Sequence, residues 1–136
     1  MKTIIRWSGF ACFLLTASYI YGAYAEDCRQ HLQAGTSYRT WHQGPTLAFS
    51  GQITIDRTYQ CPEGICFSAK MSFDNYNGGM DIATGFWAGS RFELRRYVAA
   101  GNNTQMWSGQ CIAKSVRGNW YIENEQSNKG QFSITY

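Results

Sequence analysis

The chain has 136 residues, and its 12 Lys and Arg residues against 9 Asp and Glu residues give a formal net charge of +3. This length suits one domain with one hydrophobic core. The only basic doublet is Arg95-Arg96, whereas a polyanion binder shows a basic stripe, so the composition argues against nucleic acid as a partner.

The first 25 residues have the parts of a secretory signal peptide. Met1–Arg6 is a short basic start, an apolar stretch runs from Trp7 to Ile20, and Ala23-Tyr24-Ala25 fits the small-x-small rule of signal peptidase. The alternative is a retained membrane anchor, for which the apolar stretch is short. We therefore predict that residues 1–25 are cleaved and that residues 26–136 form a single β domain. This domain is predicted to be secreted or periplasmic, with no membrane association after cleavage.

The predicted mature chain keeps 111 of the 136 residues and four of the five cysteines. An even number of cysteines in an exported chain predicts two disulfides rather than a metal site. The alternation of the strands places Cys66 outward and Cys111 inward, and two side chains on opposite faces are poorly placed to bridge. We therefore predict that Cys61–Cys66 closes a turn and that Cys28 pairs with Cys111.

The first predicted element of the mature chain is a short helix over 28–33, capped by Asp27 and ended by Gly35. From there, apolar residues alternate with polar ones, which predicts strands with one buried face. In chain order the predicted strands cover residues 38–42, 49–55, 67–73, 80–88, 91–98, 105–113, 119–123 and 131–136. Turn-forming clusters of Gly, Pro and Asn separate them.

About eight short strands with such turns predict an all-β fold, a small antiparallel meander barrel tied by disulfides. Closing the sheet removes its unpaired edges, and a two-sheet β-sandwich is the alternative. Trp107-Ser108-Gly109-Gln110-Cys111 is similar to one strand of avidin, and the whole pattern resembles small barrels of the avidin and lipocalin-like kind. The resemblance implies an architecture alone, because the sequence has no counterpart of avidin's biotin-binding turn.

No residue pattern predicts catalysis. The mature chain contains two histidines, no nucleophile elbow and no glycine-rich phosphate loop. His42 stands beside Trp41 and a turn, which predicts a surface histidine. No pair of carboxylates stands out for glycoside hydrolysis. The oxygen-bearing residues Asp74, Asn75, Asn77 and Asp81 have the spacing of a polar turn rather than of a calcium loop. We therefore predict no enzyme activity, no metal and no cofactor.

The parity of each strand sorts the aromatic residues into two faces. The predicted inward set is Phe49, Phe67, Phe73, Phe86, Phe92, Trp107, Trp120 and Phe132. The predicted outward set is Trp41, Trp87, Tyr97 and Tyr121. Outward aromatic rings stack on sugars or anchor protein partners, and the alternative is that they form cross-strand pairs that stabilise the sheet.

These patterns predict an exported, non-catalytic binding protein, such as an inhibitor or a surface-ligand binder, that uses its outward aromatic residues on a protein or carbohydrate partner. One alternative is a carbohydrate-binding module. Another is a carrier of a small hydrophobic ligand inside the barrel, where Gly51, Gly109 and Ala113 would leave room. Asn102-Asn103-Thr104 is a glycosylation sequon, used only if the chain enters a eukaryotic secretory pathway.

Overall fold

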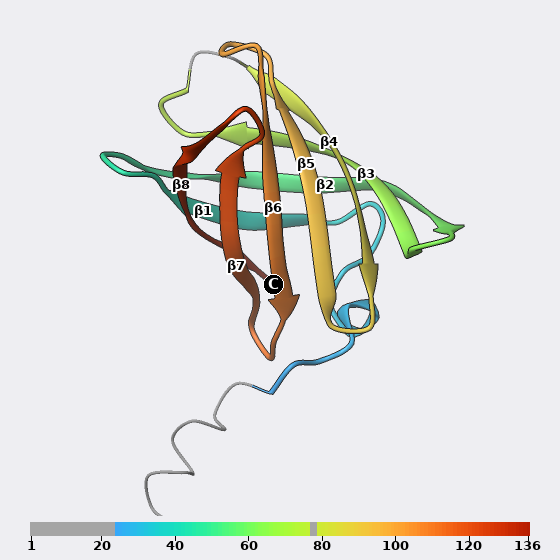
Figure 1. Cartoon of the computed structure of the whole chain (residues 1–136). Helices are drawn as coiled ribbons and strands as arrows, with labels where there is room; N and C mark the ends of the chain where they lie inside the picture. The colour runs from blue at the N-terminus through green and yellow to red at the C-terminus, as the bar shows by residue number, and fades with distance from the viewer. Residues whose placement is uncertain (1–23, 77–78) are drawn as a thin grey trace, which may run out of the picture.

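The computed structural model describes residues 24–76 and 79–136, in which eight antiparallel strands form a closed barrel (Figure 1). Each strand pairs with its neighbours in sequence, and the first strand also pairs with the last. The strands are β1 (Ser37–Gln43), β2 (Ala48–Cys61), β3 (Gly64–Phe73), β4 (Met80–Ala88), β5 (Arg91–Val98), β6 (Asn103–Cys111), β7 (Ser115–Ile122) and β8 (Glu125–Thr135). The predicted meander barrel is confirmed, and the β-sandwich is not formed.

Most of the predicted signal peptide, residues 1–25, lies outside the described residues, so its cleavage stays a prediction. Among the residues that the structure describes, no helix is long and apolar enough to cross a membrane.

The alternation of apolar and polar residues produces the barrel by placing one face of each strand inside. Along β3, for example, Phe67 and Met71 are fully buried, while Lys70 faces solvent. The rings of Trp107 and Phe132 meet in the core with centroids 4.7 Å apart. Burying a large apolar side chain of this kind stabilises the fold by roughly 1.5 to 3 kcal/mol.

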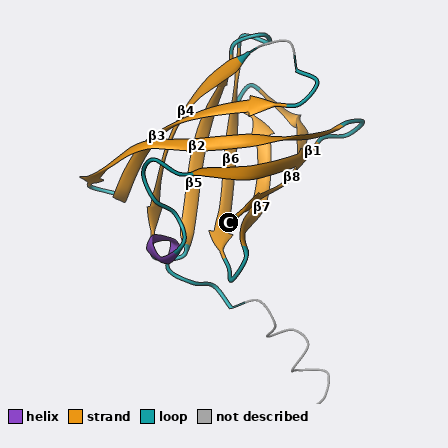
Figure 2. Ribbon diagram, turned by 180° about the vertical axis from the view of Figure 1, so that it is seen from behind, coloured by secondary structure: helices purple, strands orange, loops and turns teal. Residues whose placement is uncertain are grey.

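The N-terminal segment closes one end of the barrel (Figure 2). The predicted helix over 28–33 is shorter than expected: a 3-10 turn, η1, spans Cys28–Gln30, and the Asp27 carboxylate accepts a hydrogen bond from the Arg29 N–H at 3.0 Å. The Glu26 N–H donates to the Cys111 carbonyl oxygen at 2.8 Å, and a disulfide joins Cys28 to Cys111. This bridge confirms the predicted pairing.

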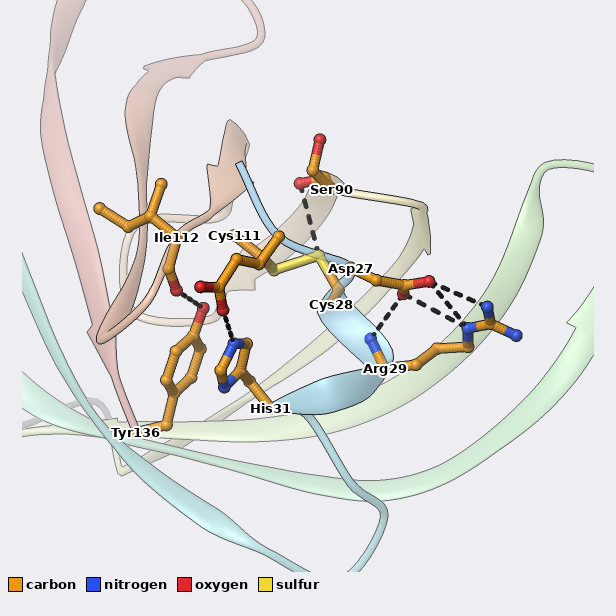
Figure 3. A network of polar contacts seen from close by, with 9 residues as sticks. Asp27, Cys28, Arg29, His31, Ser90, Cys111, Ile112 and Tyr136 are labelled. Carbon is orange, nitrogen blue, oxygen red and sulfur yellow. Dashed lines mark hydrogen bonds and ion pairs between the residues drawn. A yellow bond between two sulfur atoms is a disulfide. The ribbon is translucent and has the colours of Figure 1, made fainter. Parts of the chain in front are cut away.

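A network of polar contacts completes the closed end (Figure 3). The Nε2 atom of His31 lies 2.6 Å from a carboxylate oxygen of Glu26, and the His31 ring stacks on Tyr136 with centroids 4.3 Å apart. The Tyr136 hydroxyl donates to the Ile112 carbonyl oxygen at 2.8 Å. Burial raises the pKa of Tyr136 to about 12, so this hydroxyl keeps its proton at neutral pH.

The hairpin of β2 and β3 extends beyond the neighbouring strand β1 (Figure 1). β1 pairs with β2 only as far as Thr54, whereas β2 continues to Cys61. The second predicted disulfide, Cys61–Cys66, ties this extension together and is also confirmed.

The prediction for β4 has the wrong parity. Trp87 was expected to point outward, but it is 3% exposed and its ring packs on Phe67, with centroids 5.3 Å apart. Phe86 was expected inward and instead lies on the outer face, beneath the guanidinium of Arg91. The error arises because Asp81 occupies an inward position at the start of β4. The residues of β4 that alternate with Asp81 are therefore more apolar as a set, and the sequence pattern makes this outward set look like the buried one.

The small residues proposed to leave room inside the barrel do not do so. A Cβ atom at Gly51 would collide with the Ser72 carbonyl oxygen and the Phe73 ring. At Gly109 it would collide with the Arg117 backbone, and Ala113 is exposed beyond the end of β6. These glycines allow strands to approach closely rather than opening a cavity.

Candidate functional site

A cavity of about 140 Å³ lies inside the barrel, at the end opposite η1. We call this end the mouth. In an antiparallel meander the ends of odd-numbered strands and the starts of even-numbered strands meet at the same end. The mouth therefore gathers residues that are far apart in the sequence. The cavity is lined by His42, Phe49, Phe73, Tyr76, Arg96, Val98 and Gln105.

Arg96 lines the cavity and takes part in a buried ion pair. Asp81 on β4 and Arg96 on β5 are both almost inaccessible to solvent, and Nη2 of Arg96 lies 2.7 Å from Oδ2 of Asp81. The Nε–H of Arg96 donates to the same oxygen at 2.9 Å, while the other carboxylate oxygen accepts the Ala99 N–H at 3.2 Å. Burial lowers the pKa of Arg96, and the Asp81 carboxylate opposes this effect. The pair brings no net charge to the interior.

Two further residues extend this pair into a chain of hydrogen bonds. The Gln105 side-chain oxygen accepts from Nη1 of Arg96 at 2.9 Å and from the Trp107 indole N–H at 3.1 Å. The face of the guanidinium lies over the Phe73 ring, 4.1 Å from its centroid. Arg96 is therefore fixed by polar contacts around its edge and by an aromatic ring on its face.

His42 lies in a cage of aromatic rings beside this wall. Its imidazole stacks on Phe49 with centroids 5.1 Å apart, and the other rings of the cage are Phe73, Trp107 and Trp120. Burial, together with the positive charge of Arg96, lowers the pKa of His42 from 6.5 to about 3. The imidazole is therefore neutral at physiological pH, with one nitrogen as donor and the other as acceptor.

The Nδ1 atom of His42 is buried and has no hydrogen-bond partner among the described residues. The hydroxyl oxygen of Thr40, two residues earlier on the same face of β1, is in the same situation. Most buried polar atoms in proteins are paired, and an unpaired one costs about 1 to 3 kcal/mol. Both atoms are closed to solvent, so each carries this cost in the interior of the barrel.

The predicted outward aromatic residues do not form one surface. Trp41, Tyr97 and Tyr121 are exposed, at 36%, 44% and 37% respectively, and Trp87 is buried as described above. Trp41 lies between β2 and β8, next to Ser133, whereas Tyr97 pairs with Ile82 of β4. Tyr121 lies opposite Met106 on β6. Tyr97 lines a shallow hollow together with Ile82 and Met80, which are also exposed.

Sequence reasoning placed Phe49 and Phe73 inward but missed the polar residues of the mouth. His42 was expected on the surface but is 3% exposed, and Asp81 was assigned to a polar turn but lies inside the barrel. The signal was present in β1, because His42 shares the parity of Tyr38, a residue of the core. In β5, Arg96 likewise continues the inward series of Phe92 and Leu94.

The residues of the mouth do not form a nucleophilic or acid–base constellation, because the neutral His42 is surrounded by rings and Arg96 is held by its partners. Within the described residues, one cluster of three metal-ligating side chains occurs, Cys61, Glu63 and Cys66. Its two sulfur atoms are bonded to each other, so neither is available as a thiolate ligand.

Comparison with known proteins does not assign the chain to a group. No family model matches it. No curated protein matches its sequence significantly.

Proposed function

We propose that this protein is an exported, non-catalytic binding protein that takes a small ligand into the mouth of its barrel. The observation that carries the proposal is the cavity of about 140 Å³ at the mouth, which is lined by aromatic rings and by the Arg96 guanidinium that Asp81 and Gln105 hold in place. A concave, mostly apolar site with a few polar groups is the usual form of a small-molecule site. The two disulfides indicate an oxidising compartment, which supports export.

The closed end of the barrel supports this assignment to the mouth. The disulfide Cys28–Cys111 and the contacts of η1 fix one end, so a ligand reaches the interior from the other. Phe49, Tyr76 and Val98 are only partly buried at the mouth, and they form the rim of the cavity.

A fragment screen by ligand-observed NMR tests the proposal. Val98→Phe fills the rim of the cavity, and Ile82→Phe adds the same ring to the outer face of the neighbouring strand as a matched control. We expect fragments that bind the wild-type protein and the Ile82→Phe variant but not the Val98→Phe variant. A screen in which no fragment depends on Val98 would refute binding in the mouth.

A second candidate function is binding of a protein partner on the outer face of β4 and β5. Its support is the exposed patch formed by Met80, Ile82 and Tyr97, which are 60%, 62% and 44% exposed. Ile82 and Tyr97 are directly paired across the two strands. A photo-crosslinking amino acid at Ile82 should capture a defined partner in the producing organism, whereas the same group at Ser68 on β3 should not. Equal capture at both positions would contradict a specific interface.

A further inference from the structure

We propose that a hollow on the outer face of the barrel binds a sugar ring that carries a carboxylate, a ligand with the chemistry of a uronic acid. The hollow lies across β1, β8 and β7, and its side-chain lining includes Trp41, Ser133, Arg117, Asn119 and Gln131. It shares no lining residue with the mouth, so this inference does not depend on the proposed function. Three properties carry it, namely an exposed aromatic ring, free hydrogen-bonding groups and an unmatched positive charge.

The strand register forms the hollow. Trp41 on β1 lies opposite Ser133 on β8, and Ser133 lies opposite Arg117 on β7. Two large side chains therefore flank a small one, and their strands are two spacings apart, which is about 9 to 10 Å. The hollow is open to solvent, so it would hold one ring of a longer glycan while the rest of the glycan extends away from the barrel.

The indole ring of Trp41 supplies an apolar surface at one side of the hollow. It is 36% exposed, although a tryptophan on a strand of a small barrel can be almost fully buried, as Trp107 and Trp120 are. A pyranose ring presents a face of C–H groups, and these groups are attracted to the negative face of an aromatic ring. A sugar that packs on Trp41 in this way keeps its hydroxyl groups at its edge, towards the polar side chains of the hollow.

These polar side chains are free to bind a ligand. Asn119 and Gln131 lie opposite each other, two residues along the strands from Arg117 and Ser133, and both are exposed. Among the described residues, neither amide side chain has a hydrogen-bond partner, and the same is true of the Ser133 hydroxyl. A primary amide has both donors and an acceptor, so two adjacent amides match the neighbouring hydroxyl groups of a sugar, each of which donates and accepts.

The charge of the hollow favours a carboxylate on the sugar. Nε of Arg117 donates to the Ser115 hydroxyl at 3.3 Å, and Arg117 has no acidic partner within the described part of the chain. β1, β6 and β7 contain no Asp or Glu, and β8 contains only Glu125, at its first position. Arg39, on the same face of β1 as Trp41, adds a second positive charge. A guanidinium binds a carboxylate through two parallel hydrogen bonds, which a single hydroxyl group does not match.

Matched glycosides test this inference on the protein expressed from its full sequence. The probes are the methyl glycosides of glucuronic and galacturonic acid and those of glucose and galactose, so each acid differs from its neutral counterpart only at carbon 6. NMR titrations give the affinities. We expect at least one uronide to bind about three- to tenfold more tightly than its neutral counterpart, the effect of one charged contact at a partly exposed site. This preference should diminish at high salt.

Cyclohexanecarboxylate is the control for the sugar hydroxyl groups, because it carries the same charge on a six-membered ring without them. It should bind more weakly than the uronide. A second readout uses the wild-type protein alone. Since Trp87, Trp107 and Trp120 are less than 5% exposed, quenching by acrylamide reports mainly on Trp41. The bound uronide should protect Trp41 from this quenching.

Two pairs of variants locate the site. Arg117→Gln should remove the preference for the uronide over its neutral counterpart, whereas Arg57→Gln, the same change at an exposed position of β2 outside the hollow, should keep it. Trp41→Ala should weaken both glycosides at least tenfold. Tyr121→Ala removes an equally exposed ring outside the hollow and should have no effect. The probe ratios and the quenching need no variant, so the test stands even if Trp41→Ala does not fold.

The outcomes separate this inference from the proposed function of the mouth. Equal affinities for the acidic and the neutral glycosides would overturn the role of Arg117. Cyclohexanecarboxylate binding as tightly as the uronides would overturn the assignment to a sugar and indicate another carboxylate, such as a peptide C-terminus. If no glycoside binds, the inference fails and the mouth is unaffected. A uronide that is blocked by Val98→Phe but not by Trp41→Ala would overturn the hollow and support the mouth.

Discussion

Asp81 and Arg96 are joined diagonally across β4 and β5, inside the barrel, because the direct partner of Arg96 in the strand register is Ala83. Neither side chain reaches solvent. Each charge is therefore tolerated only in the presence of the other, and this dependence can be measured.

Removing one partner of this pair should be far more harmful than removing both. Asp81→Ala leaves the Arg96 guanidinium buried without its counter-ion, which should lower the free energy of unfolding by about 3 to 5 kcal/mol. The double variant Asp81→Leu with Arg96→Met should recover much of this loss. Urea unfolding curves measure both effects.

The control for the ion pair is Glu123→Ala, which breaks the exposed pair between Glu123 and Arg95. A surface pair of this kind contributes about 0 to 1 kcal/mol to stability, so the urea concentration at the midpoint of unfolding should hardly change. A double variant as unstable as Asp81→Ala would show that the loss comes from packing rather than from the unpaired charge.

His42 should make the stability of the protein depend on pH below neutrality. Its pKa is about 3 in the folded protein, against an ordinary value of 6.5. The unfolded chain therefore binds the proton first, and stability is lost as the pH falls from about 6.5 towards 3. By pH 5, before most carboxylates titrate, the expected loss is about 2 kcal/mol.

Unfolding free energies at pH 7.5 and pH 5, for the wild-type protein and His42→Phe, check this expectation. The variant lacks the titrating group and should lose about 2 kcal/mol less over the same interval. If the wild-type protein and the variant lost the same unfolding free energy between pH 7.5 and pH 5, His42 would be protonated inside the barrel.

The two disulfides should contribute unequally to stability. Cys28 and Cys111 are 83 residues apart in the sequence, whereas Cys61 and Cys66 are 5 residues apart. In the chain-entropy model the long loop is worth about 4.5 kcal/mol and the short one about 2 kcal/mol. Urea melts of Cys28→Ser with Cys111→Ser should therefore show the lower midpoint of the two paired variants. A greater loss in Cys61→Ser with Cys66→Ser would contradict the entropic account.

The correction at Trp87 can be tested by fluorescence quenching. Trp41 is 36% exposed, whereas Trp87, Trp107 and Trp120 are all less than 5% exposed. Iodide should therefore quench a component that disappears in Trp41→Phe and persists in Trp87→Phe. If Trp87→Phe removed the quenchable component, the parity of β4 in the structure would be wrong.

The strands could be predicted because a strand with one buried and one solvent-exposed face has a sequence in which apolar and polar residues alternate. β4 and β5 were predicted with their observed bounds. β2 was predicted to end at Ile55, but it continues to Cys61, because its last residues extend beyond β1 and are exposed on both faces. Where neither face is buried, no alternation of apolar residues marks the strand.

The mouth could not be predicted in the same way. Its cavity requires Phe49, Arg96 and Gln105 to meet across three strands, and that meeting depends on the register between strands. The register follows from turn geometry and packing, which the alternation within one strand does not determine. In addition, the inward charges of Asp81 and Arg96 contradict the rule that polar residues face solvent. Such exceptions are expected at functional sites.

The pairing of β1 with β8 has a consequence for how the chain folds. The other pairings of the barrel join consecutive strands, which can form from local contacts. The pairing of β1 with β8 instead brings Thr40 opposite Ile134, so nearly the whole domain must be ordered before the barrel closes. Non-local contacts of this kind slow folding, because loop-closure entropy is lost before the contacts compensate for it. We therefore expect this pairing to set the folding rate. An oxidised Cys28–Cys111 bridge joins the start of the domain to the end of β6, so it should accelerate folding by shortening the loop between β1 and β8.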